Sequence, residues 1–365
     1  MEVSLLSRRI RRHAALAACL FRALPLLSQS FEDLAARANE ARQSDRTDEA
    51  ASLYQKALAR RPAWGEGWWY LGTLLYDRDD YSEAAAALQH AVTLNPQSGP
   101  AAAMLGLCEA KLDRGSDALV HLDAGLKQGA GADPALRRVV LYTKGSLLLA
   151  AGRFGDAQET LDMLAREGIA EDELIMALGC AVLGLKTADG ATHEIVRQAG
   201  WAEHFAAQGD YTQAEREYAT LAAQAPGFHD VQFAYGRFLL ANHQDDRAVE
   251  AFEREIQNTP NHLLARLGIA GIKLQTGPAA GVPYAEQAVK LAPGLCESHY
   301  LLGALLLETG DTQRAIRELE NARRLDPRQA RVYFELSRAY AKVQRKEDAA
   351  RARAEFARLN QENSK

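Results

Sequence analysis

Prolines recur along this chain at an almost constant interval. Pro62 and Pro96 lie 34 residues apart, and a second series is spaced by 34, 33 and 34 residues: Pro226, Pro260, Pro293 and Pro327. A single compact core has no reason to repeat its prolines in this way, whereas a stack of equal units places one at each joint. The spacing therefore predicts a tandem repeat of about 34 residues over most of the chain.

Each repeat is expected to be a pair of crossing helices. If a unit begins 31 residues before its proline, its eighth position is small throughout: Ala38, Gly72, Gly106, Gly145, Ala202, Gly236, Ala270, Gly303 and Ser337. The twentieth is alanine in every unit except the one that starts at Leu263, which lacks a residue: Ala50, Ala84, Ala118, Ala157, Ala214, Ala248, Ala315 and Ala349. The twenty-fourth is bulky in most units: Tyr54, Leu88, Leu122, Leu161, Tyr218, Phe252 and Leu319. Small residues let two helices cross closely, and the bulky residue one turn later fills the space to the next pair.

Composition and turn residues also favour helices. The chain is rich in Ala, Leu, Glu and Arg, which are strong helix formers, and it shows no alternating run typical of a strand. Gly152, Gly209, Gly277 and Gly310 fall between the two expected helices of a unit, where a left-handed backbone can end the first helix. The sequence thus predicts an all-α fold.

The period, the paired helices and the small crossing residues resemble the tetratricopeptide-repeat (TPR) family, of bacterial type. The resemblance covers residues 31–360 and implies a tandem helix-turn-helix solenoid, a right-handed superhelix of about nine repeats. The units would begin near Phe31, Gly65, Gly99, Arg138, Ile195, His229, Leu263, Cys296 and Ala330. We expect an N-terminal array of about four repeats over residues 31–171, and a C-terminal array of about five over residues 195–365 with a short polar tail.

Residues 172–194 depart from this pattern. They hold one apolar stretch, from Asp172 to Leu185, followed by a polar segment from Lys186 to Gly190. Gly179 stands where a first helix would cross its partner, yet no full second helix follows. We interpret the segment as an irregular single-helix break between the two arrays. A degenerate tenth repeat with regular packing is the alternative.

No catalytic or metal-binding motif is found. The sequence has no His-Glu-x-x-His, no phosphate-binding glycine loop and no Gly-x-Ser-x-Gly. Its four cysteines lack metal-ligand spacing. The net charge is −5, and no Lys/Arg cluster lies beyond the first thirty residues, which excludes the basic surface of a nucleic-acid-binding protein. We therefore expect a non-enzymatic protein without metal or cofactor; an enzyme is a remote alternative.

The TPR resemblance places the binding surface on the first helix of each unit. It implies that positions 2, 5, 9 and 12 or 13 face a concave groove. Position 5 alternates between small and aromatic residues along much of the chain, and position 9 adds two arginines; both residue types are typical of binding hot spots. The candidate groove residues are Trp69, Tyr142, Phe233, Arg237, Tyr300, Phe334 and Arg338. Packing against the neighbouring helix is the alternative role for the aromatic members.

Residues 1–30 differ from the rest of the chain. Four arginines between Arg8 and Arg12 precede a mostly apolar run from Ala14 to Leu27, and Ser28-Gln29-Ser30 offers small residues to a signal peptidase. This order predicts a signal peptide, although Arg22 interrupts the run and a retained amphipathic helix is the alternative. The residues before Cys19 resemble a lipoprotein box, but their apolar stretch is too short, so we do not expect a lipid anchor there. No later segment has the ~18 apolar residues needed to span a membrane.

These features together predict a protein-protein interaction scaffold that binds a partner polypeptide in its groove. If the leader is a signal peptide, the protein works in the bacterial cell envelope, in the periplasm, or is secreted. A cytoplasmic assembly or co-chaperone-like scaffold, with the first thirty residues retained, is the alternative.

Overall fold

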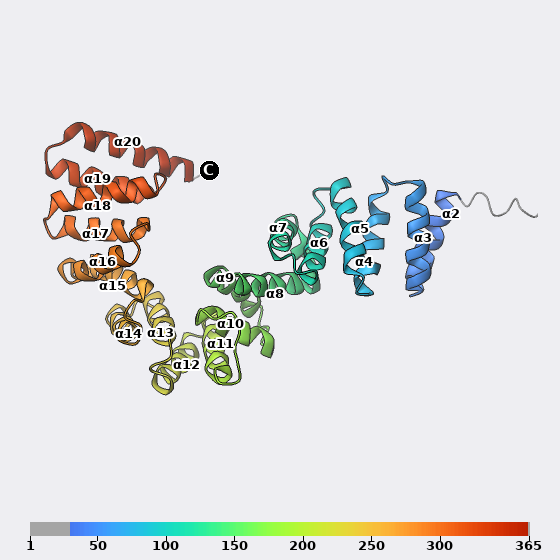
Figure 1. Ribbon diagram of the computed structural model, residues 1–365, viewed down its shortest axis with the longest axis horizontal. Helices are drawn as coiled ribbons and strands as arrows, with labels where there is room; N and C mark the ends of the chain where they lie inside the picture. Colours follow the sequence, from blue (N-terminus) through green and yellow to red (C-terminus); the bar gives the residue numbers. More distant parts are fainter. Residues whose placement is uncertain (1–29, 364–365) are drawn as a thin grey trace, which may run out of the picture. The chain divides into compact units, whose positions relative to one another are not determined.

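The computed structural model describes residues 30–363, so the predicted signal peptide lies outside the described residues except for Ser30. Within this range all regular structure is helical and no strand occurs (Figure 1). The chain divides into two compact units, residues 1–147 and 148–365. The predicted all-α TPR-like solenoid is confirmed.

The described part of the first compact unit holds six complete helices and most of a seventh. They are α2 (Phe31–Gln43), α3 (Thr47–Arg60), α4 (Gly65–Asp77), α5 (Tyr81–Leu94), α6 (Gly99–Lys111), α7 (Gly115–Lys127) and α8 (Pro134–Ala150), with a short 3-10 turn, η2 (Ala130–Ala132). The second unit begins within α8. It continues with α9 (Phe154–Arg166), α10 (Asp172–Val182), α11 (His193–Gln208), α12 (Tyr211–Gln224), α13 (Val231–Ala241), α14 (Asp245–Asn258), α15 (Leu263–Thr276), α16 (Pro278–Leu291), α17 (Cys296–Glu308), α18 (Thr312–Leu325), α19 (Ala330–Lys342) and α20 (Lys346–Asn363).

Helix starts follow the predicted register. Helices α2, α4, α6, α15, α17 and α19 begin at the residue predicted to open a unit, and α8, α11 and α13 begin within four residues of it. Consecutive helices pair as hairpins, for example α4 with α5 and α17 with α18, and within each compact unit neighbouring hairpins are in contact, as α5 with α6 and α16 with α17. Such contacts between neighbours alone are the basis of a repeat solenoid.

The helix crossings explain the small residues at the eighth position. A Cβ added to Gly72 would lie 2.5 Å from Leu88 Cγ, and one added to Gly303 would lie 2.6 Å from Leu319 Cγ. In both cases the obstructing residue is the bulky one at position 24 of the same unit. The alanines at position 20 are all buried, most of them completely. The predicted crossing is therefore confirmed at the level of individual atoms.

The turns between paired helices follow the glycine prediction with one exception. Gly152, Gly209 and Gly310 have φ values of 73°, 81° and 93° and so take the left-handed conformation. Gly277 was predicted to do the same, but this was wrong: its φ is 179°, which is extended backbone. The cause is the residue missing from that unit, because Gly277 alone joins α15 to α16 and no room remains for a left-handed turn.

Helix α10 is followed by a non-helical segment up to residue 192, and α11 packs against α10 as its partner. A Cβ on Gly179 of α10 would lie 1.8 Å from the carbonyl oxygen of Val196, and one on Gly200 of α11 would lie 1.9 Å from that of Ile175. Helix α11 also pairs with α12 and contacts α9. It thus belongs to two hairpins at once. Whether the arrays on either side of this segment behave as separate domains stays a prediction.

None of the described helices has both the length and the apolar character that crossing a membrane requires.

Candidate functional site

The predicted groove residues are distributed over both units and do not gather in one site. In the first unit, Trp69 of α4 is half-buried and packs against the hydrophobic core. Tyr142 of α8 is also half-buried. Neither position decides between binding and packing, so the role of these two residues stays a prediction.

The aromatic candidates of the second unit make extensive contacts within the chain. The ring of Phe233 lies 5.7 Å from that of Phe252 and 4.6 Å from that of His262. Tyr300 is half-buried, and the guanidinium of Arg331 lies 4.4 Å from its ring centre. Phe334 stacks near Phe356 but remains 44% exposed. Among these aromatic side chains, Phe334 offers the most surface.

The two candidate arginines are in different surroundings. Arg338 donates to Glu308 at 2.7 Å and to Glu335 at 2.8 Å, so two carboxylates of the chain already balance its charge. Arg237 is exposed, and its Nη1 donates to Gln158 Oε1 at 3.1 Å. Unlike Arg338, Arg237 donates to a neutral amide and not to a carboxylate, and it is therefore the better-placed receptor.

Arg237 lines a cavity of about 260 Å³ in the second unit. The walls come chiefly from α9, α11, α12 and α13, with one apolar residue from α10. The lining residues are Gln158, Asp162, Arg166, Val182, Glu203, Ala206, Ala207, Tyr211, Tyr218, Ala234, Arg237, Phe238, Ala241 and Asn242. Glu203 and Arg237 occupy position 9 of successive first helices. This cavity is therefore at the surface where the TPR resemblance places the groove.

Hydrogen bonds hold one carboxylate of the cavity in place. Tyr218 donates its hydroxyl to Glu203 Oε2 at 2.6 Å, and Gln158 donates its amide to Glu203 Oε1 at 2.6 Å. Burial, followed by the charge of Glu203, raises the pKa of Tyr218 well above its usual range. Tyr218 thus remains a hydrogen-bond donor, and both Glu203 oxygens have a partner.

A second carboxyl in the cavity, that of Asp162, lacks such support. Asp162 is 9% exposed, and its Oδ1 has no hydrogen-bond partner in the part of the chain that the structure describes. Burial and the nearby charge of Glu203 raise the pKa of Asp162 to about 7, against the opposing effect of Arg166 and Arg237. An unpartnered buried carboxyl is costly and uncommon, and here it faces a cavity.

Asp162 was not among the predicted groove residues, because the TPR resemblance places only first helices at the groove. Asp162 comes from the second helix of its unit, α9, which reaches the cavity where the hairpin pattern is interrupted by α10. A signal was present in the sequence: Asp162 stands inside the apolar run Leu161 to Ala165, on the buried side of the helix. A charged residue in such a run is expected to be buried, and buried charged residues are usually paired.

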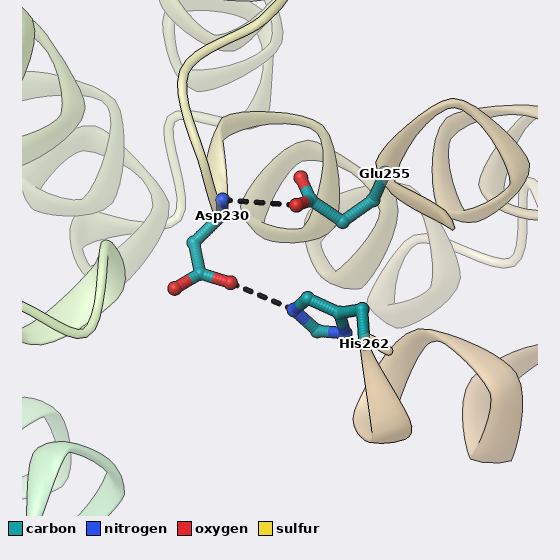
Figure 2. A group of neighbouring side chains, drawn as sticks. All are labelled: Asp230, Glu255 and His262. Atoms are coloured by element: carbon teal, nitrogen blue, oxygen red, sulfur yellow. Dashed lines mark hydrogen bonds and ion pairs between the residues drawn. The ribbon is translucent and has the colours of Figure 1, made fainter. Parts of the chain in front are cut away.

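A different cluster, Asp230, Glu255 and His262, has the residue types of a metal centre, and Figure 2 shows their side chains turned toward one another. The carboxylate of Glu255 accepts the backbone N–H groups of Asp230 at 3.2 Å and Phe233 at 3.3 Å, and the hydroxyl of Thr259. His262 Nε2 donates to Asp230 Oδ1 at 2.7 Å, while its Nδ1 accepts a backbone N–H. The cluster is thus a capping network for the N-terminus of α13.

Comparison with protein families decides the assignment. The tetratricopeptide-repeat family model matches the chain over residues 35–99, 71–133, 200–262 and 300–361, which together are more than half of its length. The chain is a tetratricopeptide-repeat protein. No curated protein matches the sequence of this TPR chain.

Solved structures that resemble the TPR chain include several forms of MamA. A MamA RS-1 double mutant has 19% identity and a TM-score of 0.44, covering 47% of this chain and 96% of its own. MamA of Desulfovibrio magneticus RS-1 has 21% identity and a TM-score of 0.42, covering 47% and 97%. YrrB, described as a TPR protein with an unusual peptide-binding site, has 16% identity and a TM-score of 0.42, covering 46% and 90%. Each match extends over less than half of the TPR chain.

Proposed function

We propose that this TPR protein is a non-enzymatic scaffold that binds a partner polypeptide along the first helices of its hairpins. Its membership of the TPR family supports a role in protein binding. The observation that carries the proposal is the cavity at groove position 9, where an exposed arginine and an unpartnered carboxyl lie within one recess. Polar groups of this kind select a partner, and apolar neighbours such as Phe233 supply contact area.

A pair of substitutions tests this proposal once a partner has been captured from the native source. Arg237→Ala removes an exposed side chain whose one hydrogen bond within the described residues is to Gln158, so the fold should persist. Phe233→Ala removes a ring that also packs on Phe252 and His262, so this change can affect stability as well as binding. A hot-spot residue should lose about 2 kcal/mol of binding free energy, or roughly thirtyfold in affinity, with helical circular dichroism unchanged.

Wild-type affinity in both variants would move the contact to the opposite face of the helices or to the loops. Unfolding of both would make these residues part of the core. Gln313→Ala is a suitable control, since Gln313 is exposed on the second helix α18 and should affect neither binding nor fold.

We further propose that the scaffold is exported to the cell envelope or beyond it. The basic start, apolar run and small residues of positions 1–30 support this location. N-terminal sequencing of the native protein, after cell fractionation, tests it: a mature chain that begins near Phe31 is expected. A chain that starts at Met1 in the cytoplasmic fraction would favour the cytoplasmic assembly or co-chaperone-like scaffold instead.

A further inference from the structure

We propose that the cavity between α9, α11 and α13 receives a cationic side chain, a lysine or an arginine, of the partner polypeptide, with the Asp162 carboxylate as its receptor. This inference rests on the proposed function, because it names what one recess of the binding surface recognises. It begins from a buried aspartate that lines the cavity and whose Oδ1 has no hydrogen-bond partner among the described residues.

The remaining groups of the cavity leave this role to Asp162. Glu203 accepts hydrogen bonds at both oxygens, from Tyr218 and Gln158, and is therefore fixed as a second negative charge rather than a free acceptor. A donor that enters the cavity would complete the hydrogen bonding of Asp162 and would lie near both carboxylates. The cost of burying Asp162 without a partner would then be offset on binding.

The distribution of charge and size favours a cation over other side chains. Asp162 is buried and Glu203 half-buried, whereas Arg166 and Arg237 are exposed, so negative charge lies deeper in the cavity than positive charge. An acidic side chain would be repelled by the two carboxylates, and an apolar one would leave Asp162 unpaired. Four alanines line the cavity and leave room for the aliphatic stem of a lysine or arginine: Ala206, Ala207, Ala234 and Ala241.

Binding of a cation should depend on pH near neutrality. The groups that face Asp162 are Glu203 of α11, Arg237 of α13, Tyr218 of α12, and Glu159 and Arg166 of its own helix. Since burial and the neighbouring carboxylates raise its pKa to about 7, Asp162 is partly protonated at neutral pH. A cation binds the ionised form, so affinity should fall about tenfold from pH 8 to pH 6 as that form is lost.

Small probes test the cavity on the full chain without the partner. N-acetyl-arginine methylamide and N-acetyl-lysine methylamide would be titrated at pH 8 and pH 6 and followed by the NMR signal of the Asp162 carboxyl carbon. The neutral glutamine and anionic glutamate analogues serve as comparison probes. We expect the cationic probes to bind at pH 8 and to bind about tenfold more weakly at pH 6. At pH 8 their affinity should exceed that of both analogues.

Three variants make the result specific. Asp162→Asn should weaken cationic binding about tenfold or more and remove its pH dependence. Glu173→Gln removes a charge from an exposed residue of α10 that does not line the cavity, and it should leave binding unchanged. Ala241→Leu narrows the cavity at an exposed position without altering charge and should also weaken binding, which keeps the test valid if Asp162→Asn fails to fold.

Equal binding of the glutamine or glutamate analogue, no cationic binding, or wild-type behaviour of Asp162→Asn would overturn the inference. Such a failure is separate from failure of the proposed function. The latter is judged by whether the captured partner responds to Arg237→Ala, and it does not depend on how the small probes behave.

Discussion

Asp162 is the residue whose environment departs most from the rest of its helix. The other buried residues of α9 that surround it are mainly alanine and leucine, and only Asp162 among them carries a titratable side chain. Its raised pKa has a consequence for stability. Between about pH 4 and pH 7 the folded chain keeps a proton on Asp162 that the unfolded chain has released.

The sign of this effect follows directly. Because the native state binds more protons than the unfolded state in that range, stability should fall as pH rises from about 4 to about 7. Asp162→Asn should remove this dependence and stabilise the protein at pH 8, with a difference of about 3 pKa units setting an upper limit of roughly 4 kcal/mol. Urea unfolding midpoints at several pH values measure it, with Glu173→Gln, an exposed residue outside the cavity, as control. Parallel midpoint curves for wild type and Asp162→Asn would show that Asp162 is not buried as described.

Ala315 is a second residue with a sharp expected effect. It is completely buried where α17 and α18 cross, beside Gly303. Ala315→Leu should overpack this crossing and lower the free energy of unfolding by about 1–3 kcal/mol. Gln313→Leu introduces the same side chain at an exposed position of α18 and should change stability little. The chemical denaturation midpoint distinguishes the two, and an unchanged midpoint in Ala315→Leu would argue against this crossing.

Residues of these two kinds differ in how far the sequence could predict them. Ala315 and its counterparts recur at a fixed position in every regular unit, so their burial could be inferred from the period alone. Asp162 occurs once, and its role depends on residues from three other helices. The single-residue link at Gly277 was likewise unpredictable as backbone geometry, although the missing residue that causes it is visible in the sequence.

Helix α11 packs very closely against α10. It crosses α10 at Gly200 and Gly179, where backbone meets backbone. A methyl group at Gly200 would collide with the carbonyl of Ile175, and a backbone atom cannot move aside as a flexible side chain can. Gly200→Ala should therefore destabilise the protein by about 1–3 kcal/mol, despite the gain in helix propensity.

A matched substitution separates packing from propensity. Gly271 lies within α15, and a Cβ added there meets no atom within 4 Å. Gly271→Ala should stabilise by about 0.5–1 kcal/mol, because alanine replaces glycine in a helix at no steric cost. Thermal unfolding followed by circular dichroism compares the pair. If both variants shift the melting temperature in the same direction, α10 and α11 do not cross as closely as described.

For the molecule as a whole, the segment between α10 and α11 is the expected point of cleavage. Most residues from Lys186 to Ala191 are exposed and lie outside any helix. Limited digestion with subtilisin should cut there first, between residues 186 and 192, with the turn at 309–311 as an internal control. Intact-mass analysis locates the cut. Earlier cleavage at the control turn would contradict the prediction.

The nicked chain should not fall apart. Both α9 and α10 contact α11 across the cleavage point, so the two fragments share a buried interface. We expect them to elute together in size-exclusion chromatography under native conditions and to separate in denaturant. The polar segment after α10 was visible in the sequence. The sharing of α11 was not, since a pattern based on identical neighbours cannot show one helix with two partners.

This double role of α11 limits how the gene can change in length. Repeats that differ only in surface residues can be gained or lost through unequal recombination, because each new neighbour offers the same contacts as the old one. Loss of residues 195–228 would bring α13 against α10. Ala234 would then occupy the place of Gly200, and Asp230 that of Val196. The first exchange places a methyl group in a contact between backbone atoms, and the second places a charged side chain in an apolar contact. This unit should therefore be retained when other repeats are gained or lost.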